Sequence, residues 1–200
     1  MSQADQQRWN QRYAQGAYSE RTHPSEFLRR WLPKLALGAN ASALDVACGA
    51  GRNALFLAAS GYRVSAVDGA SVAIERGRAA AQAAGLRVQW LVADLDAGVP
   101  QSLDSKESGF DLIIMIRYVN LPLLARLQQR LKPGGYLLVE QHLQTDMLVG
   151  GPQRAAFRVP RNALQEATQD LCCVAAEQGL FADPDGKPMA LSRLLARRQN

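Results

Sequence analysis

From Ala41 onward, short apolar runs alternate with stretches of strong helix formers. This alternation is typical of βαβ units, in which the strands are parallel and helices cover both faces of one sheet. Strands are predicted at 42–47, 62–68, 86–94, 110–116 and 136–143, and helices between them at 52–60, 71–84 and 121–131. The run FDLIIMI at 110–116 is apolar on both faces, as expected of a strand in the middle of a parallel sheet.

The C-terminal part departs from a plain parallel pattern. After a helix near 161–170, two β-rich runs at 171–182 and 189–198 are separated only by the turn sequence DPDGKP. Strands joined by so short a turn are antiparallel. We therefore predict an α/β, Rossmann-like, doubly wound fold: a mostly parallel seven-stranded sheet with a C-terminal antiparallel hairpin and an N-terminal helical lid.

The length of 200 residues suits a single domain. We expect a helical lid at 1–40, a cofactor-binding core at 41–145, and a C-terminal helix and hairpin at 146–200. No apolar run is long enough for a membrane span, and the N-terminus lacks an apolar signal-peptide core. These features predict a cytoplasmic protein that does not associate with membranes.

The net charge of +5 would by itself favour nucleic-acid binding. Residues 1–37, however, hold six basic and three acidic groups, and residues 187–200 hold four basic groups and no acidic one. The 149 residues between them therefore carry 13 basic and 15 acidic groups, a net charge of −2. Because the excess lies at the two ends, the charge fits a small anionic substrate as well as a nucleic acid.

Cysteine and histidine are scarce. The three cysteines, Cys48, Cys172 and Cys173, form no C-x-x-C pair, so neither a disulfide framework nor a metal site is predicted. Cys172 and Cys173 lie in an apolar run and are expected to fill the core, whereas Cys48 is expected to face the pocket. His142 follows a strand, where it is compatible with a base or with a packed strand-end residue.

The most informative motif is LDVACGAGRNALFLA, residues 44–58. It predicts a strand, a glycine turn and a helix in direct succession, with Gly49 allowing the tight turn and Gly51 letting a ligand approach the backbone. The unpaired N–H groups of the helix N-terminus face such a ligand. Ala54 completes G-x-G-x-x-A, a pattern that nicotinamide-dinucleotide sites share.

Two further carboxylates end the next two strands, Asp68 at the second and Asp94 at the third. Ligands of open α/β sheets lie at the carboxyl ends of strands, so Asp45, Asp68 and Asp94 are expected to surround one pocket. Asp68 has oxygens suited to the two hydroxyls of a ribose. Each residue also has a structural interpretation: Asp45 bridging the turn, Asp68 capping the next helix and Asp94 lying in a loop.

These motifs together resemble those of the class I S-adenosylmethionine-dependent methyltransferases. LDVACGAGRN is similar to the family's glycine-rich motif, AVD to its acidic ribose-binding residue, VADLD to its adenine-contacting segment, FDLIIM to its fourth strand and LKPGGYLLVE to its fifth-strand motif. The resemblance covers about residues 40–145, in the correct order and spacing.

The resemblance implies S-adenosylmethionine as the cofactor. It places the 45–51 turn beside the amino acid end of the cofactor, Asp68 at the ribose, and Asp94 with Leu95 at the adenine. The implied cofactor-binding residues are Trp9, Tyr13, Asp45, Ala47, Cys48, Gly49, Gly51, Asn53, Asp68, Gly69, Asp94, Leu95 and Arg117. Arg117 and Tyr118, after the fourth strand, are expected where the methyl group and the substrate meet.

The N-terminal segment narrows the resemblance. W-N-x-R-Y and R-T-H-P-S-E, together with G-R-N, are similar to small bacterial methyltransferases of the tellurite-resistance type, which cover the cofactor with this segment and methylate soft chalcogen nucleophiles. Trp9 and Tyr13 would then form part of a lid, and Arg21 would be a cation for an acidic substrate or the cofactor carboxylate. Trp9 and Tyr13 also have the spacing of a helix packing face, and Arg21 that of a surface charge.

The closing hairpin differs from that family. There it carries a histidine and an arginine thought to assist catalysis, whereas this chain has Phe181 near the expected histidine and Arg193 as its basic candidate. The predicted function is methyl transfer by in-line displacement to a small-molecule acceptor, such as a thiol or a selenium or tellurium oxyanion. A soft anion or thiolate needs no general base, and positioning supplies most of the rate.

Three other functions remain open. G-x-G-x-x-A with Asp68 also fits a nicotinamide-dependent oxidoreductase, although the hairpin and the helical segment before the glycine turn disfavour it. A nucleic-acid methyltransferase would use the basic ends, but the segment after the fourth strand, I-R-Y-V-N, lacks the N-P-P-Y motif. A cofactor-binding protein without activity has the same sequence pattern. We expect a small-molecule substrate, no nucleic-acid partner, and a monomer or homodimer.

Overall fold

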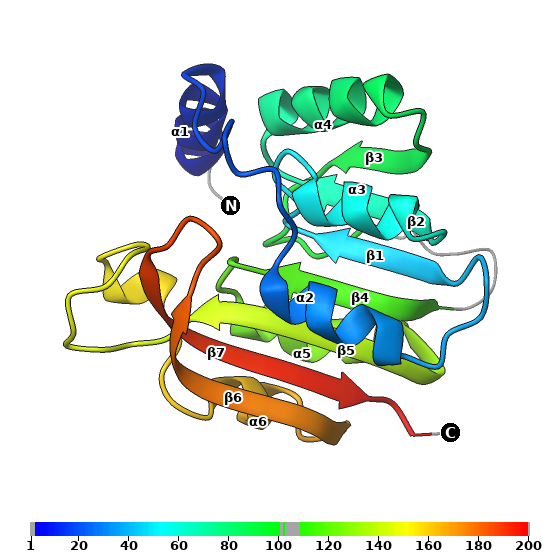
Figure 1. Ribbon diagram of the computed structural model, residues 1–200, viewed down its shortest axis with the longest axis vertical. Coiled ribbons are helices and arrows are strands. Elements are labelled where there is room, and N and C mark those ends of the chain that lie inside the picture. Colours follow the sequence, from blue (N-terminus) through cyan, green and yellow to red (C-terminus); the bar gives the residue numbers. More distant parts are fainter. Residues whose placement is uncertain (1–2, 101, 103–108, 200) are drawn as a thin grey trace.

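A seven-stranded sheet forms the centre of the computed structural model, which describes residues 3–100, 102 and 109–199 (Figure 1). The strand order is β3-β2-β1-β4-β5-β7-β6, parallel from β3 to β5 and antiparallel at β7 and β6. The strands are β1 (Ser42–Val46), β2 (Arg63–Asp68), β3 (Val88–Val92), β4 (Phe110–Ile116), β5 (Leu131–His142), β6 (Cys172–Ala182) and β7 (Pro188–Arg197). The predicted fold class is confirmed.

Helices cover both faces of the sheet. They are α1 (Gln3–Ala14), α2 (Glu26–Trp31), α3 (Arg52–Ala59), α4 (Ser71–Ala83), α5 (Leu121–Leu127) and α6 (Ala163–Ala167). On β4, Ile113 and Met115 pack in the apolar cluster that includes α5 and α6, whereas Leu112 and Ile114 pack in the cluster that includes α2, α3 and α4. The alternation of side chains along a strand thus places apolar residues in both clusters. No described helix is long and apolar enough to cross a bilayer.

The antiparallel hairpin follows the prediction closely. In the turn between β6 and β7, the backbone N–H of Asp183 donates to the carbonyl of Lys187 at 3.0 Å, and that of Gly186 donates to the carbonyl of Asp183 at 2.7 Å. Figure 1 shows this turn on the same side as α1 and the carboxyl ends of the parallel strands. The hairpin therefore brings residues from the end of the chain to the predicted ligand-binding edge.

Several local predictions were wrong in detail. The helix predicted at 121–131 ends at Leu127, is followed by a single 3-10 turn at 128–130, and gives way to β5 at Leu131. The KPGG segment therefore lies inside β5, where the pairing with β4 shifts in register, and Gly134 has a φ of 76°. The strand predicted at 86–94 is shorter, Val88–Val92. The segment between the third and fourth strands, 96–109, which has the polar composition of a surface loop, lies partly outside the described residues.

The cysteine predictions were also wrong. Cys172 and Cys173 are exposed, because β6 is the edge strand of the sheet and a register shift falls beside them. Cys48 is buried rather than facing an open pocket, because its side chain packs in the cluster of α2, α3 and α4. Burial raises the pKa of the Cys48 thiol well above its ordinary value, so the side chain is a neutral thiol.

The N-terminal segment forms two separate helices. Helix α2 is anchored in the core by Phe27 and Leu28, both fully buried. Helix α1 instead packs beside α4, where the Asn10 side chain accepts a hydrogen bond from the backbone N–H of Val72 at 3.1 Å. Residue Ala70, at the N-cap position of α4, has no capping side chain of its own. Asn10 therefore supplies the cap from another helix.

Candidate active site

The glycine turn follows β1 as predicted. Gly49 and Gly51 have φ values of 56° and 83°, conformations that glycine adopts without strain. Ala47 has a φ of 57°, and Arg117, the first residue after β4, has a φ of 63°. Strained residues of this kind gather at functional sites. Val46 of β1 lies opposite Met115 of β4, so Ala47 and Arg117 lie just beyond the ends of two neighbouring strands.

Asp68 holds the glycine turn in place. Its carboxylate accepts one hydrogen bond from the backbone N–H of Gly49 and one from that of Ala70, each at 2.8 Å. Burial raises its pKa, and these backbone donors offset part of that effect. Asp68 thus links β2 to the turn after β1, and Gly69 beside it is buried.

The two glycines of the turn have different neighbours. A Cβ at Gly49 would collide with the Tyr13 hydroxyl, so α1 reaches the turn through this side chain. A Cβ at Gly51 would instead collide with the ring of Trp90, which also lies against Gly77 of α4. The expectation that Gly51 leaves room for a ligand is therefore not supported: its open side receives a tryptophan from β3.

Asp45 is a buried carboxylate at the end of β1. Its Oδ2 atom has no hydrogen-bond partner in the part of the chain that the structure describes. Burial raises its pKa to about 8, against the opposing charge of Arg52. An unpaired buried carboxylate oxygen is costly unless a donor or cation supplied by a ligand reaches it.

Three other residues that were predicted to bind the cofactor, Leu95, Asp94 and Asn53, differ in burial and in their contacts. Leu95 is fully buried in the cluster of α5 and α6, so its side chain cannot face a ligand. Asp94 lies nearer the surface and accepts a hydrogen bond from the backbone N–H of Asp96 at 3.0 Å. The buried Asn53 accepts a hydrogen bond from the backbone N–H of Ser25 at 2.9 Å. Asn53 thus holds the N-terminal segment against α3.

Helix α1 carries an aromatic cluster. The rings of Trp9, Tyr13 and Tyr18 have centroids 5.9–6.5 Å apart. Arg76 of α4 donates to the carbonyls of Tyr13 and Ala17 at 3.3 and 3.0 Å, which fixes the C-terminal end of α1. Burial raises the pKa of Tyr13, and the charge of Asp68 adds to this, so the hydroxyl above Gly49 stays protonated.

Arg117 begins a second group of charged residues. Its Nε donates to Oε1 of Glu140 at 2.9 Å, and its Nη2 faces Oδ1 of Asp183 at 3.4 Å. The Nη1 atom is buried and has no partner among the described residues. Tyr118, which follows it, is half-buried and packs against the α5 cluster. Burial raises the pKa of its phenol.

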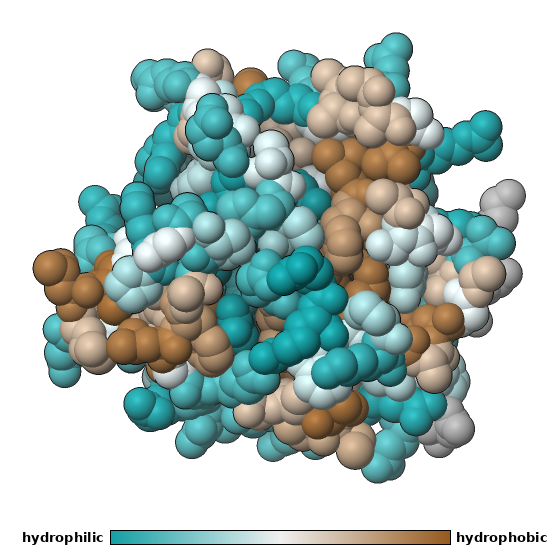
Figure 2. All heavy atoms as spheres, in the orientation of Figure 1, coloured by the Kyte–Doolittle hydropathy of each residue, from teal (hydrophilic) through white to brown (hydrophobic). Residues whose placement is uncertain are grey.

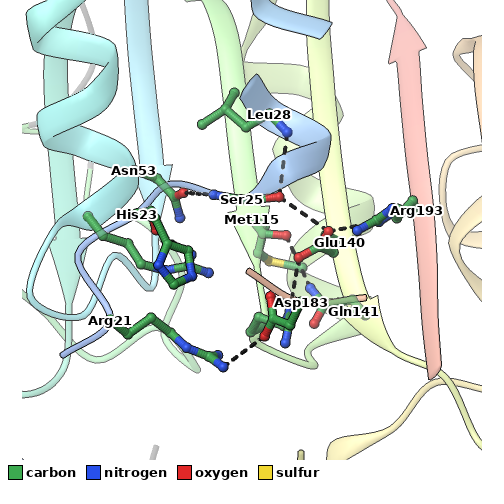
Figure 3. A network of polar contacts seen from close by, with 12 residues as sticks. Arg21, His23, Ser25, Leu28, Asn53, Met115, Glu140, Gln141, Asp183 and Arg193 are labelled. Atoms are coloured by element: carbon green, nitrogen blue, oxygen red, sulfur yellow. Dashed lines mark hydrogen bonds and ion pairs between the residues drawn. The ribbon is translucent and has the colours of Figure 1, made fainter. Parts of the chain in front are cut away.

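Glu140 connects this group, as Figure 3 shows. Its Oε2 accepts from Nε of Arg193 at 2.8 Å and from the hydroxyl of Ser25 at 3.2 Å. Burial alone would raise the pKa of Glu140, but the charges and hydrogen bonds of Arg117 and Arg193 outweigh it and lower the pKa. The sequence prediction missed Glu140, although a glutamate inside the apolar run YLLVEQHL could have indicated a buried ion pair.

Arg21 pairs with the hairpin. Its Nη2 lies 2.7 Å from a carboxylate oxygen of Asp183 (Figure 3) and 2.7 Å from one of Asp185. Two carboxylates from the hairpin turn thus pair with Arg21, and its role as a cation for an acidic substrate or the cofactor carboxylate stays a prediction. His23, Asp183 and Asp185 also place one potential metal-ligating atom each within 4.8 Å of one another. The prediction of no metal site remains untested.

The charged residues around Arg117 include more cations than carboxylates: the four arginines Arg21, Arg52, Arg117 and Arg193, and the three carboxylates Glu140, Asp183 and Asp185. Arg52 is desolvated and lies near the like charges of Arg117 and Arg21, and both effects lower its pKa. It donates only to a backbone carbonyl, that of His23, at 2.8 Å. His142 packs against Gly151, and burial, together with the charges of neighbouring arginines, lowers its pKa to about 3. His142 is therefore uncharged at neutral pH.

The site thus has two halves. We call the ends of β1 and β2, with Asp45, Gly49 and Asp68, the glycine half. We call the group after β4 and β5 and in the hairpin the arginine half; its members are Arg21, Arg52, Arg117, Glu140, Asp183, Asp185 and Arg193. Figure 2 shows hydrophilic residues across the centre of the face drawn and hydrophobic residues at its left edge, where Figure 1 places the segment between β5 and α6. Met147 and Leu148 of that segment are exposed.

Comparison with known proteins agrees with this geometry. Residues 43–135 match a family model described as a methyltransferase domain. No curated protein sequence gives a significant match. The chain is similar in structure to TehB from Haemophilus influenzae, with a TM-score of 0.70, 20% identity, and coverage of 92% of this chain and 66% of the TehB chain. It therefore spans slightly less than two thirds of that protein.

Two further structures are matched over nearly their whole length. A SAM-dependent methyltransferase from Methanosarcina mazei has a TM-score of 0.67 and 19% identity, with 88% of this chain and 99% of that chain covered. A TehB-like SAM-dependent methyltransferase from Corynebacterium glutamicum has a TM-score of 0.61 and 19% identity, with 99% and 100% covered. The chain therefore has the fold of these methyltransferases, and its residues 43–135 match a methyltransferase domain.

Proposed function

We propose that the protein transfers a methyl group from S-adenosylmethionine to a small acceptor with a soft or anionic nucleophile, such as a thiol or a selenium or tellurium oxyanion. The observation that carries this proposal is the buried guanidinium of Arg117, which has an unpaired Nη1 directly after β4. A buried donor without a partner favours an acceptor oxygen or an anion from a ligand. Structural similarity to TehB supports the proposal.

The residues of the glycine half fit the cofactor. The unpaired Oδ2 of Asp45 suits an ammonium group, because that oxygen is buried and otherwise costly. The Asp68 carboxylate accepts from the backbone N–H groups of Gly49 and Ala70, and Gly69 is a further backbone donor. Since a carboxylate offers about four acceptor positions, it can still accept from a ribose hydroxyl. Tyr13 would cover the Gly49 turn. Since the Leu95 side chain is buried, an adenine contact there would use the backbone of residues 94–96.

The cofactor, when bound, supplies a methyl group on a sulfonium sulfur, which passes to the attacking lone pair by in-line displacement while the sulfur keeps the bonding electrons. The protein has mainly to orient the acceptor and exclude water. Arg117 would hold an anionic acceptor, and Tyr118 would flank it. A soft anion needs no base, which agrees with the uncharged, packed state of His142. Arg21 would act indirectly, by holding the carboxylates of Asp183 and Asp185 in position.

The test is a screen for S-adenosylhomocysteine formation with thiols, selenite, tellurite, phenols, carboxylates and amines. Turnover restricted to soft or anionic nucleophiles, and reduced at least tenfold by Arg117→Met, is the expected result. Binding of S-adenosylhomocysteine, measured by calorimetry, should be weakened far less by the same change. Methylation of amines or RNA alone, or turnover that Arg117→Met leaves unchanged, would overturn the proposed acceptor class.

A further inference from the structure

The hairpin turn places a carboxylate directly in the arginine half. The side chain of Asp183 is only 7% exposed, and its two oxygens face two different arginines. Oδ2 pairs with Arg21 at 2.7 Å, whereas Oδ1 lies 3.4 Å from Nη2 of Arg117. Charge-assisted hydrogen bonds normally measure about 2.7–2.9 Å, so the contact with Arg117 is the looser of the two.

The backbone of the turn fixes this position. Asp183 donates its N–H to the carbonyl of Lys187 at 3.0 Å and accepts at its own carbonyl from Gly186 at 2.7 Å. These bonds close the turn between two long paired strands. The carboxylate therefore belongs to a rigid element and is held by Arg21, so it does not need Arg117 to stay in place.

Asp185 is the natural comparison. It also pairs with Arg21 at 2.7 Å, but its side chain is 38% exposed, and no contact joins it to Arg117. The side-chain hydrogen bond to Arg21 holds the pKa of Asp185 at about 2, so Asp185 is charged at neutral pH. The two carboxylates thus share one cation and differ in whether they face Arg117.

We propose that Asp183 is a specificity-determining residue that sets the charge of the acceptor bound at Arg117. This inference rests on the proposed acceptor site at Arg117. The carboxylate faces one side of that guanidinium, so an anionic acceptor must approach Arg117 beside a fixed negative charge, while neutral and cationic acceptors meet no such repulsion. Like charges brought together in a partly desolvated site reduce affinity strongly.

Three thiols test the proposal, because they carry the same nucleophilic sulfur and differ in charge: thioglycolate is anionic, 2-mercaptoethanol neutral and cysteamine cationic. Asp183→Asn keeps an oxygen that can face Arg21 but removes the charge. We expect kcat/KM for thioglycolate, divided by that for cysteamine, to rise roughly tenfold or more in this variant. Asp185→Asn is the matched control and should change the ratio less than threefold. Asp183→Glu should keep the parent ratio.

A binding measurement separates this proposal from the proposed function. The affinity of selenite for the protein saturated with S-adenosylhomocysteine can be measured by calorimetry without any turnover. Asp183→Asn should bind selenite roughly tenfold more tightly than the parent or Asp185→Asn. If none of the thiols is methylated, the proposed function fails and this measurement still decides the role of Asp183. Equal or undetectable selenite binding by Asp183→Asn and Asp185→Asn overturns the proposal.

Discussion

The glycine half and the arginine half handle charge in opposite ways. In the glycine half, Asp45 and Asp68 are buried with no guanidinium or ammonium of the described residues in hydrogen-bond contact, and burial raises the pKa of both. In the arginine half, Glu140 lies between two guanidinium groups, and its pKa is lowered. A site of the first kind favours a cationic ligand, and one of the second kind favours an anion. Under the proposed function, a cationic cofactor and the methyl acceptor would therefore occupy separate positions on one sheet edge.

The largest effect is expected from removal of Glu140, which should destabilise the arginine half. Glu140→Ala leaves Arg117 and Arg193 buried without their shared counter-charge. Loss of one partner of a buried ion pair costs about 3–5 kcal/mol. We expect the free energy of unfolding, measured in urea, to fall by about that amount.

The control is Ser25→Ala, which removes one neutral donor to the same carboxylate and the N-cap of α2. Together these losses should cost about 2 kcal/mol. Similar losses for Glu140→Ala and Ser25→Ala would show that Glu140 does not balance the two arginines.

The next largest effect is expected from Asp68→Ala, which should weaken ligand binding in the glycine half. The change removes the acceptor for the N–H groups of Gly49 and Ala70, and with it the proposed ribose contact. Hydrogen bonds to a charged group contribute about 1.5–3 kcal/mol each, so we expect affinity for S-adenosylhomocysteine to fall about 100-fold. Calorimetry measures it. Parent-like binding by Asp68→Ala would remove the ribose assignment, and Asp111→Ala, away from the strand carboxyl ends, should bind normally.

How well each half could be predicted from sequence depends on how far apart its contacting residues lie along the chain. Gly49 and Asp68 lie within 19 residues of each other, and both belong to motifs with local backbone requirements. The ion pair of Arg21 with Asp183 spans 162 positions, and that of Arg193 with Glu140 spans 53. No local pattern encodes such contacts, because they depend on how the hairpin turn meets the N-terminal segment.

The same reasoning explains the errors in packing. The Leu95 side chain and the thiol of Cys48 were assigned to a pocket by sequence position, but which face of a loop packs inward depends on the tertiary structure. Trp90 fills the space beside Gly51 because β3 and α4 place it there, although the glycine pattern alone suggested room for a ligand. Sequence thus predicted the succession of strands and helices, the antiparallel hairpin and the glycine turn, and tertiary packing decided the neighbours of each side chain.

A smaller effect is expected on cofactor affinity when the pH is varied, because of Asp45 in the glycine half. Burial raises the pKa of Asp45 to about 8, so this group is mostly protonated at pH 7 in the free protein. A bound ammonium favours the ionised form, so binding must release this proton. Affinity for the cofactor should therefore rise with pH, by at most about tenfold per unit between pH 5.5 and 7.

The sign for stability is opposite. Because the pKa of Asp45 is higher in the folded chain than in the unfolded one, its contribution to the free energy of unfolding falls as the pH rises from about 4 to 8. Asp45→Asn should remove this component and flatten the pH dependence of cofactor affinity. An unchanged slope in Asp45→Asn would assign the released proton to another group.

The smallest effect is expected at Asn10, which joins α1 to the glycine half. Its side chain accepts the N–H of Val72 and so caps α4 in place of Ala70. Loss of an N-cap costs about 1 kcal/mol, so Asn10→Ala should lower the free energy of unfolding by about that amount. If α1 covers the cofactor, dissociation of S-adenosylhomocysteine should also become several-fold faster in stopped-flow measurements, whereas Gln11→Ala, at an exposed position of the same helix, should change neither. A stability loss with unchanged dissociation would mean that α1 packs on the core without covering the cofactor.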